Sequence, residues 1–158
     1  AGFAAIARQH SGWNLVIVGD GPARKELELQ IAGHGLADRI LLTGWIEHPW
    51  TLLQKASVFV LPSRYEGFPN ALLEAMARGK ACIATDCQSG PAEIIQSGIN
   101  GLLVDADHSG DVQTALEAAL DNLLSNQDLR ESLGEHATDV RSEFGAKKYF
   151  RAWDDIDV

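Results

Sequence analysis

The sequence has few cysteines, no excess of positive charge and no long hydrophobic run, and each absence removes a class of protein. No apolar stretch approaches the ~20 residues that a membrane-spanning helix needs, and no signal peptide is visible at the start of the chain. The two cysteines, Cys82 and Cys87, have four residues between them, so they form neither a CxxC redox pair nor half of a zinc site. We expect two reduced residues in or near a buried strand, in a reducing, cytoplasmic compartment.

The charge balance is acidic, with 22 Asp and Glu against 13 Lys and Arg and a net charge of −9. The sequence has no cluster of basic residues of the kind that binds nucleic acid, so we expect no nucleic-acid partner. The net negative charge does not favour binding to anionic lipid. Peripheral membrane association of a full-length protein through a local patch remains an alternative. The five histidines share no metal-binding spacing, and we expect no metal site.

The hydrophobic pattern of this 158-residue chain predicts an α/β fold. Its short apolar runs are nearly continuous, which is typical of parallel strands that are buried on both faces. They cover residues 14–18, 40–43, 57–61, 81–85 and 101–104. Helical patterns separate or follow them at 22–34, 49–56, 70–78, 91–96, 111–124 and 127–144. We therefore predict one domain, 1–158, with a doubly wound, Rossmann-like parallel sheet flanked by helices and closed by terminal helices.

The most informative segment is 62–79, which carries two glutamates with seven residues between them. Glu66 lies in a turn after a predicted strand, and Glu74 lies in the opening of an amphipathic helix. A turn that feeds a helix start presents unpaired backbone N–H groups and the positive end of the helix dipole, and both favour an anion. Carboxylates beside such a site suit a ligand with phosphates and many hydroxyls, such as a nucleotide sugar. The plain alternative is a capped helix with a solvated glutamate.

The turn itself offers several groups to that ligand. Gly67 permits dihedral angles that other residues resist. Asn70 is a good helix cap, or alternatively Pro69 occupies the first helical position. In either case we expect the amides of Asn70, Ala71 and Leu72 to point at an anion.

Two other loops follow predicted strands, where ligands of open α/β sheets bind. Gly19, Asp20 and Gly21 resemble a dinucleotide fingerprint, but Arg24 stands where GxGxxG needs its third glycine. This loop is either ligand-facing or a tight strand-to-helix turn. The second loop, Thr43, Gly44, Trp45 and Ile46, either holds a base or merely packs. Further along, Glu93 either faces the cleft or caps the helix that begins near Gly90, and we favour the structural role.

These pieces occur in an order that resembles a known family. They lie at 15–22, 59–63, 66–68, 73–77, 79, 84–86, 90–95 and 100–104. Over roughly residues 13–105 the chain resembles the C-terminal, donor-binding domain of GT-B fold, retaining glycosyltransferases of the large group 1 (GT4-like) family. The E-x7-E motif of Glu66 and Glu74, with its flanking residues, is the most specific part.

The resemblance implies a function for each part of the site. Glu66 would be the catalytic residue at the hydroxyls of the transferred sugar, and Glu74 would hold the ribose hydroxyls. Backbone groups from Gly67, Phe68, Pro69, Asn70, Ala71 and Leu72 would contact sugar and diphosphate. Thr43, Gly44, Trp45 and Ile46 would accept the base, while Gly19, Asp20 and Gly21 line the cleft.

The resemblance also implies the partners. The donor would be a nucleotide diphosphate sugar, UDP-linked on the likeness of residues 86–91, and neither a cofactor nor a metal is expected. A hexosyl group would pass to a glycan or lipid-linked acceptor in polysaccharide biosynthesis. That acceptor would be bound by a separate N-terminal domain, which this chain does not include.

The chain departs from the family in two respects. A family domain begins with a strand that carries a Gly-Arg turn and then a lysine, and neither is found, so we expect an N-terminally truncated domain that is inactive alone. Removing that strand would leave two unpaired strand edges. Pro69 also replaces a glycine that is common at that turn.

Two other functions remain as alternatives. One is a non-catalytic nucleotide-sugar-binding regulatory module, against which the intact Glu66 and Glu74 argue. The other is a GT-B nucleotide-sugar epimerase, which should lack the Glu66–Glu74 stretch.

Overall fold

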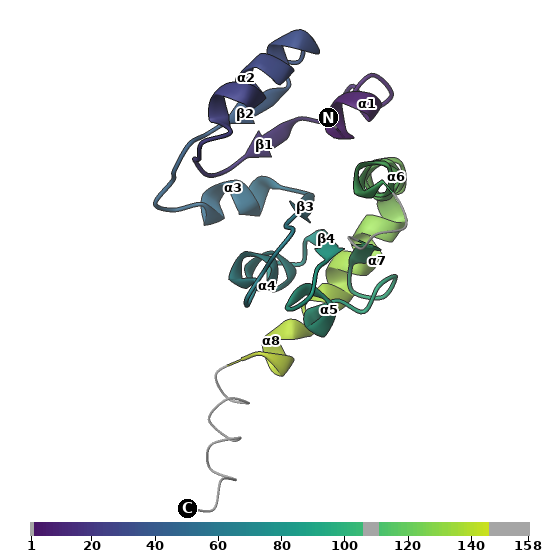
Figure 1. The fold of residues 1–158 in the computed structure, drawn as a ribbon. Coiled ribbons are helices and arrows are strands. Elements are labelled where there is room, and N and C mark those ends of the chain that lie inside the picture. Colours follow the sequence, from purple (N-terminus) through teal and green to yellow (C-terminus); the bar gives the residue numbers. More distant parts are fainter. Residues whose placement is uncertain (1, 106–110, 146–158) are drawn as a thin grey trace, which may run out of the picture.

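The computed structural model describes residues 2–105 and 111–145. Helices and strands alternate as predicted (Figure 1). In chain order they are α1 (Gly2–Ile6), β1 (Leu15–Ile17), α2 (Arg24–Gly33), β2 (Ile40–Leu42), α3 (Trp50–Lys55), β3 (Val58–Leu61), α4 (Asn70–Met76), β4 (Ala81–Asp86), α5 (Pro91–Ile94), β5 (Leu102–Asp105), α6 (Val112–Ser125), α7 (Gln127–Ala137) and α8 (Val140–Glu143). Each predicted apolar run overlaps one strand, and β4 and β5 each extend one residue beyond their runs.

All strand pairs are parallel, but the strands form two separate sheets. One sheet pairs β1 with β2, and the other has the order β3-β4-β5. Within the described residues, β1 and β3 therefore each pair on one side only. This arrangement is α/β.

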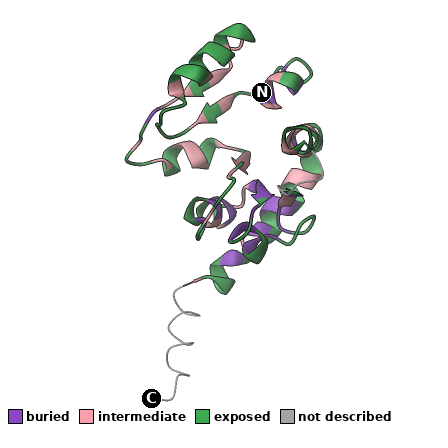
Figure 2. Cartoon of the chain, viewed as in Figure 1, coloured by how far each residue is buried: buried purple, intermediate pink, exposed green. Residues whose placement is uncertain are grey.

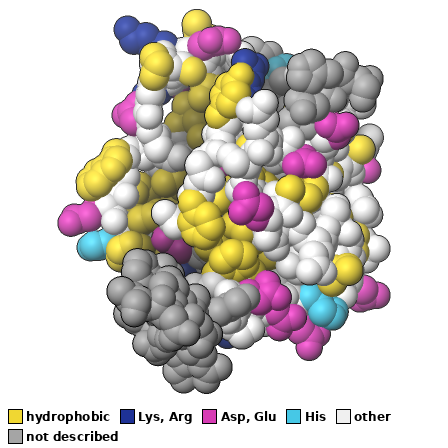
Figure 3. Space-filling model, turned by 60° about the horizontal axis from the view of Figure 1, so that its bottom comes forward, with side chains coloured by type: hydrophobic (Ala, Val, Ile, Leu, Met, Phe, Trp, Pro, Cys, Tyr) yellow, Lys and Arg dark blue, Asp and Glu magenta, His cyan; other side chains and the backbone are white. Residues whose placement is uncertain are grey.

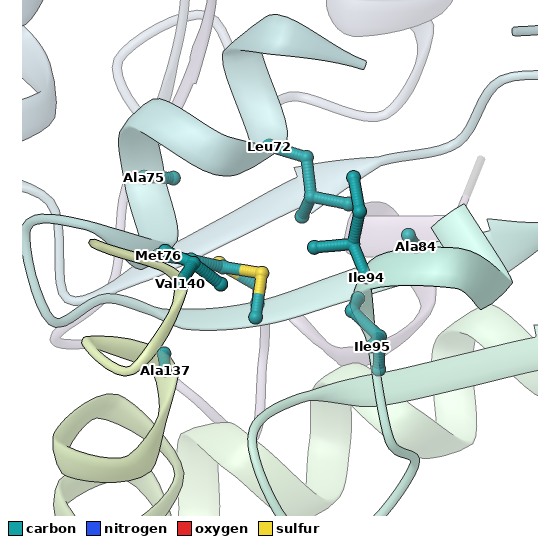
Figure 4. Close-up of a cluster of buried hydrophobic side chains, with 9 residues drawn as sticks. Leu72, Ala75, Met76, Ala84, Ile94, Ile95, Ala137 and Val140 are labelled. Carbon is teal, nitrogen blue, oxygen red and sulfur yellow. The ribbon is translucent and has the colours of Figure 1, made fainter. Parts of the chain in front are cut away.

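Strand β4 is the centre of the core, and its side chains alternate between two helical layers. Cys82 and Ala84 face a cluster that includes Leu72 and Met76 of α4, and Figure 4 shows Leu72, Met76 and Ala84 gathered there with Ile94. The neighbouring Ile83 packs in a second cluster with residues of α6 and α7. Every residue from Ala81 to Thr85 is buried, as the continuous apolar run predicts for a strand covered on both faces.

The prediction of burial on both faces is wrong for the first two strands. Val16 of β1 is 42% exposed and Leu41 of β2 is 56% exposed. Their neighbours Leu15 and Ile40 pack on the other face against a third cluster that contains Phe3 of α1. The two-stranded sheet is thus covered on one face, and the exposed colours of its region are visible at the top of Figure 2.

The single helix predicted at 127–144 is two helices. Helix α7 begins at Gln127 and ends at Ala137, and the side chain of its N-cap residue Asn126 accepts a hydrogen bond from the Leu129 N–H (3.0 Å). Thr138 and Asp139 separate it from α8, and Phe144 lies 40% exposed beyond that short helix. None of the described helices is long and apolar enough to cross a membrane.

Candidate functional site

The first glutamate lies in a loop at the carboxyl end of β3, which we call the Glu66 loop (residues 62–69). Its side chain is half-buried, and Ser63 Oγ donates a hydrogen bond of 2.6 Å to Glu66 Oε1. No described residue donates to the second carboxylate oxygen. One oxygen of Glu66 is therefore held by the protein and the other is open to a ligand hydroxyl.

The helix start after this loop differs from the expectation. Pro69 is the N-cap residue of α4, and Asn70 does not cap with its side chain. The Asn70 N–H donates to the Phe68 carbonyl (2.9 Å) and the Leu72 N–H donates to the Pro69 carbonyl (3.0 Å). The expectation that the amides of Asn70, Ala71 and Leu72 all face an anion is therefore wrong for two of them. Ala71 keeps its N–H free among the described residues.

Glu74 lies on the exposed side of α4, in the wall of a hollow of about 370 Å³. Arg78 lies one turn further along, and its Nη1 donates to the Glu74 carbonyl oxygen (3.0 Å). Arg141 and Phe144 close the other side of the hollow. The Phe144 ring also lies 6.2 Å from the Phe68 ring of the Glu66 loop, measured between centroids, so this hollow adjoins that loop.

The loops after β1 and β2 are joined by a backbone hydrogen bond. The Gly19 N–H donates to the Gly44 carbonyl (2.9 Å), and both glycines have positive φ, +122° and +70°. Thr43 Oγ donates back to the same carbonyl (2.9 Å), so this hydroxyl is used within the protein. The Trp45 side chain is 76% exposed and Ile46 is half-buried, which leaves the indole face available for stacking.

A cation that the sequence did not point to, Arg24, lies beside these joined loops. Arg24 begins α2, and its guanidinium lies 3.0 Å from Glu28 Oε1 and 3.9 Å from Asp20 Oδ2. The same guanidinium approaches Gly44, since a Cβ on that glycine would lie 3.4 Å from Arg24 Nη1. The spacing of Asp20, Arg24 and Glu28 at i, i+4 and i+8 was the available signal. Basic side chains are few on the face seen in Figure 3, where acidic ones are widespread.

The turn after β4 contacts the Glu66 loop. Ser89 Oγ donates to the Glu66 carbonyl oxygen (2.6 Å). Gly90 has φ +93°, and a Cβ there would lie 2.8 Å from Pro69 Cδ and 3.0 Å from the Gly67 carbonyl oxygen. Glu93 Oε1 accepts from the Gly90 N–H at 3.4 Å, which agrees with its structural role at the start of α5.

A second hollow, of about 210 Å³, is formed at this turn. It is lined by Ser89 and Gly90 and by the carboxylates of Asp86, Glu93 and Asp105. Neither hollow includes Glu66 or the loops after β1 and β2 in its lining. No group of three or more His, Cys, Asp or Glu within the described ranges is placed to hold a metal ion.

Both cysteines are free and buried, as expected. Burial raises the pKa of Cys82 to about 12. Its Sγ lies 3.2 Å from the Lys80 carbonyl oxygen, and its side chain belongs to the core beneath α4. Cys82 is therefore a packing residue that stays a thiol at neutral pH.

Comparison with known proteins places this geometry in a family. The model of the family "Glycosyl transferases group 1" matches residues 2–140. The exopolysaccharide phosphotransferase SCO2592 of Streptomyces coelicolor is 39% identical over 155 residues, which are 98% of this chain and 16% of that protein. The alpha-D-kanosaminyltransferase of Streptomyces kanamyceticus is 34% identical over 136 residues, which are 85% of this chain and 34% of that protein. The chain thus spans about a third or less of these curated relatives.

Solved structures show the same architecture. The pneumococcal O-GlcNAc transferase GtfA, in complex with UDP and GlcNAc, matches with a TM-score of 0.86 and 23% identity over 97% of this chain and 30% of that chain. The C-terminal domain of a glycosyl transferase group 1 family protein (LpcC) from Francisella tularensis matches with a TM-score of 0.78 and 29% identity, over 90% of this chain and 74% of that domain. The chain therefore belongs to the glycosyl transferases group 1 family, with the architecture of a GT-B C-terminal domain.

Proposed function

We propose that this chain is the donor-binding domain of a retaining glycosyltransferase. The enzyme moves a hexosyl group from a nucleotide diphosphate sugar, UDP-linked, to a glycan or lipid-linked acceptor in the synthesis of a cell-surface polysaccharide. Its catalytic residue in this domain is Glu66, and it uses neither a metal nor a cofactor. The two free cysteines support a cytoplasmic location.

One observation carries the proposal: the free oxygen of Glu66 and the exposed carboxylate of Glu74 belong to one loop and the helix that follows it. A nucleotide sugar has two sets of neighbouring hydroxyls, on the sugar and on the ribose, separated by a diphosphate. Two carboxylates that flank free backbone amides match that order of groups. We assign the sugar to Glu66 and the ribose to Glu74.

The remaining groups have complementary roles in the proposal. The N–H groups of Gly67, Phe68 and Ala71, which have no acceptor among the described residues, are donors for the diphosphate. Negative charge grows on the leaving phosphate during transfer, and fixed donors of this kind stabilise it. Trp45 stacks on the base, and Gly19 and Gly21 allow the backbone to approach the ligand.

The unpaired edges of β1 and β3 suggest how the sheet is completed in the natural protein. Open parallel edges of β-branched residues are prone to non-specific pairing, and Val16 and Leu41 leave one face uncovered. We propose that a further parallel strand of the full-length protein lies between β1 and β3. An N-terminal domain of that protein binds the acceptor, and the 158-residue chain alone transfers no sugar.

The nucleotide is tested by a thermal-shift panel of UDP, GDP and ADP with and without their sugars, on the full-length protein. A nucleotide that binds the folded state at 100 times its Kd adds about 2.7 kcal/mol to the free energy of unfolding, which raises the melting temperature by several degrees. UDP and UDP-sugars should give the largest shifts. A panel without any shift would contradict the donor-binding role.

The separate roles of the two carboxylates are tested by substitution. Glu66→Gln should lower kcat by about 100-fold or more while UDP affinity stays within about twofold, as expected when an interaction specific to the transition state is lost. Glu74→Gln should weaken UDP itself, by about tenfold, because a charged hydrogen bond to the ribose contributes about 1.5 kcal/mol. Glu135→Gln, on the exposed side of α7, is the matched control. Full turnover in Glu66→Gln would remove Glu66 from the chemistry.

A further inference from the structure

The Glu66 loop is held by side chains that neither the E-x7-E motif nor the family comparison assigns. Ser63, three residues before Glu66, donates its hydroxyl proton to Glu66 Oε1 at 2.6 Å. Ser89, 23 residues after it, donates to the Glu66 backbone carbonyl, also at 2.6 Å. The carboxylate and the main chain of one residue are thus fixed by two different hydroxyls.

Both serines are connected to the buried strand β4. Thr85, 2% exposed, donates its hydroxyl to the Ser63 carbonyl, and Ser89 follows β4 in the turn that packs Gly90 against Pro69. The loop is therefore attached to the rigid centre of the core on both sides of Glu66. Such support restricts the carboxylate to one orientation before a ligand arrives.

The direction of the Ser63 hydrogen bond decides which oxygen meets the substrate. A serine hydroxyl has one proton, and here that proton is directed to Oε1. The other oxygen has no donor among the described residues. A sugar hydroxyl that donates to Glu66 would therefore meet that second oxygen, with the carboxylate plane already fixed.

We infer that Ser63 is a positioning residue for Glu66: it holds Oε1 so that the second carboxylate oxygen is presented to a hydroxyl of the donor sugar. Ser89 assists by fixing the Glu66 main chain. This inference rests on the proposed function, because it concerns the same sugar-binding carboxylate. Ser63 acts through Glu66.

The test compares Ser63→Ala and Ser63→Thr in the full-length protein, with UDP and UDP-N-acetylglucosamine as the probes. The sugar-dependent part of binding is the ratio of the Kd of UDP to the Kd of UDP-N-acetylglucosamine. Ser63→Ala should lower this ratio by roughly 10- to 100-fold, which is the range of a hydrogen bond to a charged group. The Kd of UDP should stay within about twofold. Ser63→Thr keeps a hydroxyl at the same reach and should restore the ratio.

A double-mutant cycle separates positioning from general damage. In a Glu66→Ala background, Ser63→Ala should change the ratio by less than about threefold, since no carboxylate remains to be positioned. An equal loss in both backgrounds would overturn the inference. Ser97→Ala is the matched control. The Leu103 N–H donates a hydrogen bond of 3.0 Å to Ser97 Oγ, so this substitution also removes a serine hydrogen bond, but one outside the Glu66 loop.

If neither UDP nor UDP-N-acetylglucosamine binds, the proposed donor is wrong, but the role of Ser63 can still be tested without a ligand. Hydrogen exchange at the Asn70 amide, which is bonded to the Phe68 carbonyl, should quicken by about tenfold in Ser63→Ala and Ser89→Ala as the loop opens locally. It should be normal in Ser63→Thr and Ser97→Ala. Unchanged exchange in Ser63→Ala would show that the hydroxyl does not hold the loop.

Discussion

Gly90 is the residue where one added methyl group should disturb the candidate site most. A Cβ there would lie 2.8 Å from Pro69 Cδ and 3.0 Å from the Gly67 carbonyl oxygen, and the backbone has φ +93° and ψ −74°. That conformation costs a non-glycine residue about 1–3 kcal/mol. The contacts add about 1–3 kcal/mol of overpacking. We therefore expect Gly90→Ala to lower the free energy of unfolding by about 3 kcal/mol or more.

Gly98 provides a matched control because it shares the backbone strain without the contacts. Its φ is +83°, and a Cβ there would meet nothing within 4 Å. Gly98→Ala should therefore cost only the strain, about 1–3 kcal/mol. The difference between the two variants isolates the contact with the Glu66 loop.

The assay is urea unfolding followed by tryptophan fluorescence, combined with the Kd of the UDP-sugar probe. Pro69→Gly removes the nearest clashing atom, so it should recover part of the loss in the Gly90→Ala background and none in the Gly98→Ala background. Equal losses in the two alanine variants, within about 0.5 kcal/mol, would refute the proposed contact.

Three further predictions concern the core and the chemistry. Leu72→Ala removes a fully buried side chain of α4 and should lower the free energy of unfolding by about 3 kcal/mol. Leu29→Ala, at a side chain 75% exposed, should change it by less than about 0.5 kcal/mol in the same urea assay. Burial raises the pKa of Cys82 from 9.0 to about 12. The contribution of the Cys82 thiol to stability should therefore be complete below pH 9 and decrease by about 1.4 kcal/mol per pH unit above pH 9. A stability difference between wild type and Cys82→Ala that stays constant from pH 8 to 11 would contradict this. Turnover of the full-length protein should be unchanged by EDTA, and loss of activity that Mg²⁺ restores would refute the metal-independent mechanism.

Local pattern predicted the strands and most helices because periodicity and turn residues are properties of neighbouring positions. The run around Ile83 is continuous and its strand is buried on both faces. The run around Val16 is equally continuous, yet that strand is open on one face. The two differ in which layers cover them, and a one-dimensional pattern carries no such information.

The candidate site divides in the same way. The sequence by itself determined the two glutamates, the glycine-rich loops and the parallel order that brings strand ends to one edge, because these depend on residue type and spacing. Only the tertiary structure decided that Ser89 holds the Glu66 main chain, that Gly90 must accommodate Pro69 and that Gly19 bonds to Gly44. Each of those contacts joins loops from different strands, so it exists only after the strands have taken their places and the loops have been brought within hydrogen-bonding distance.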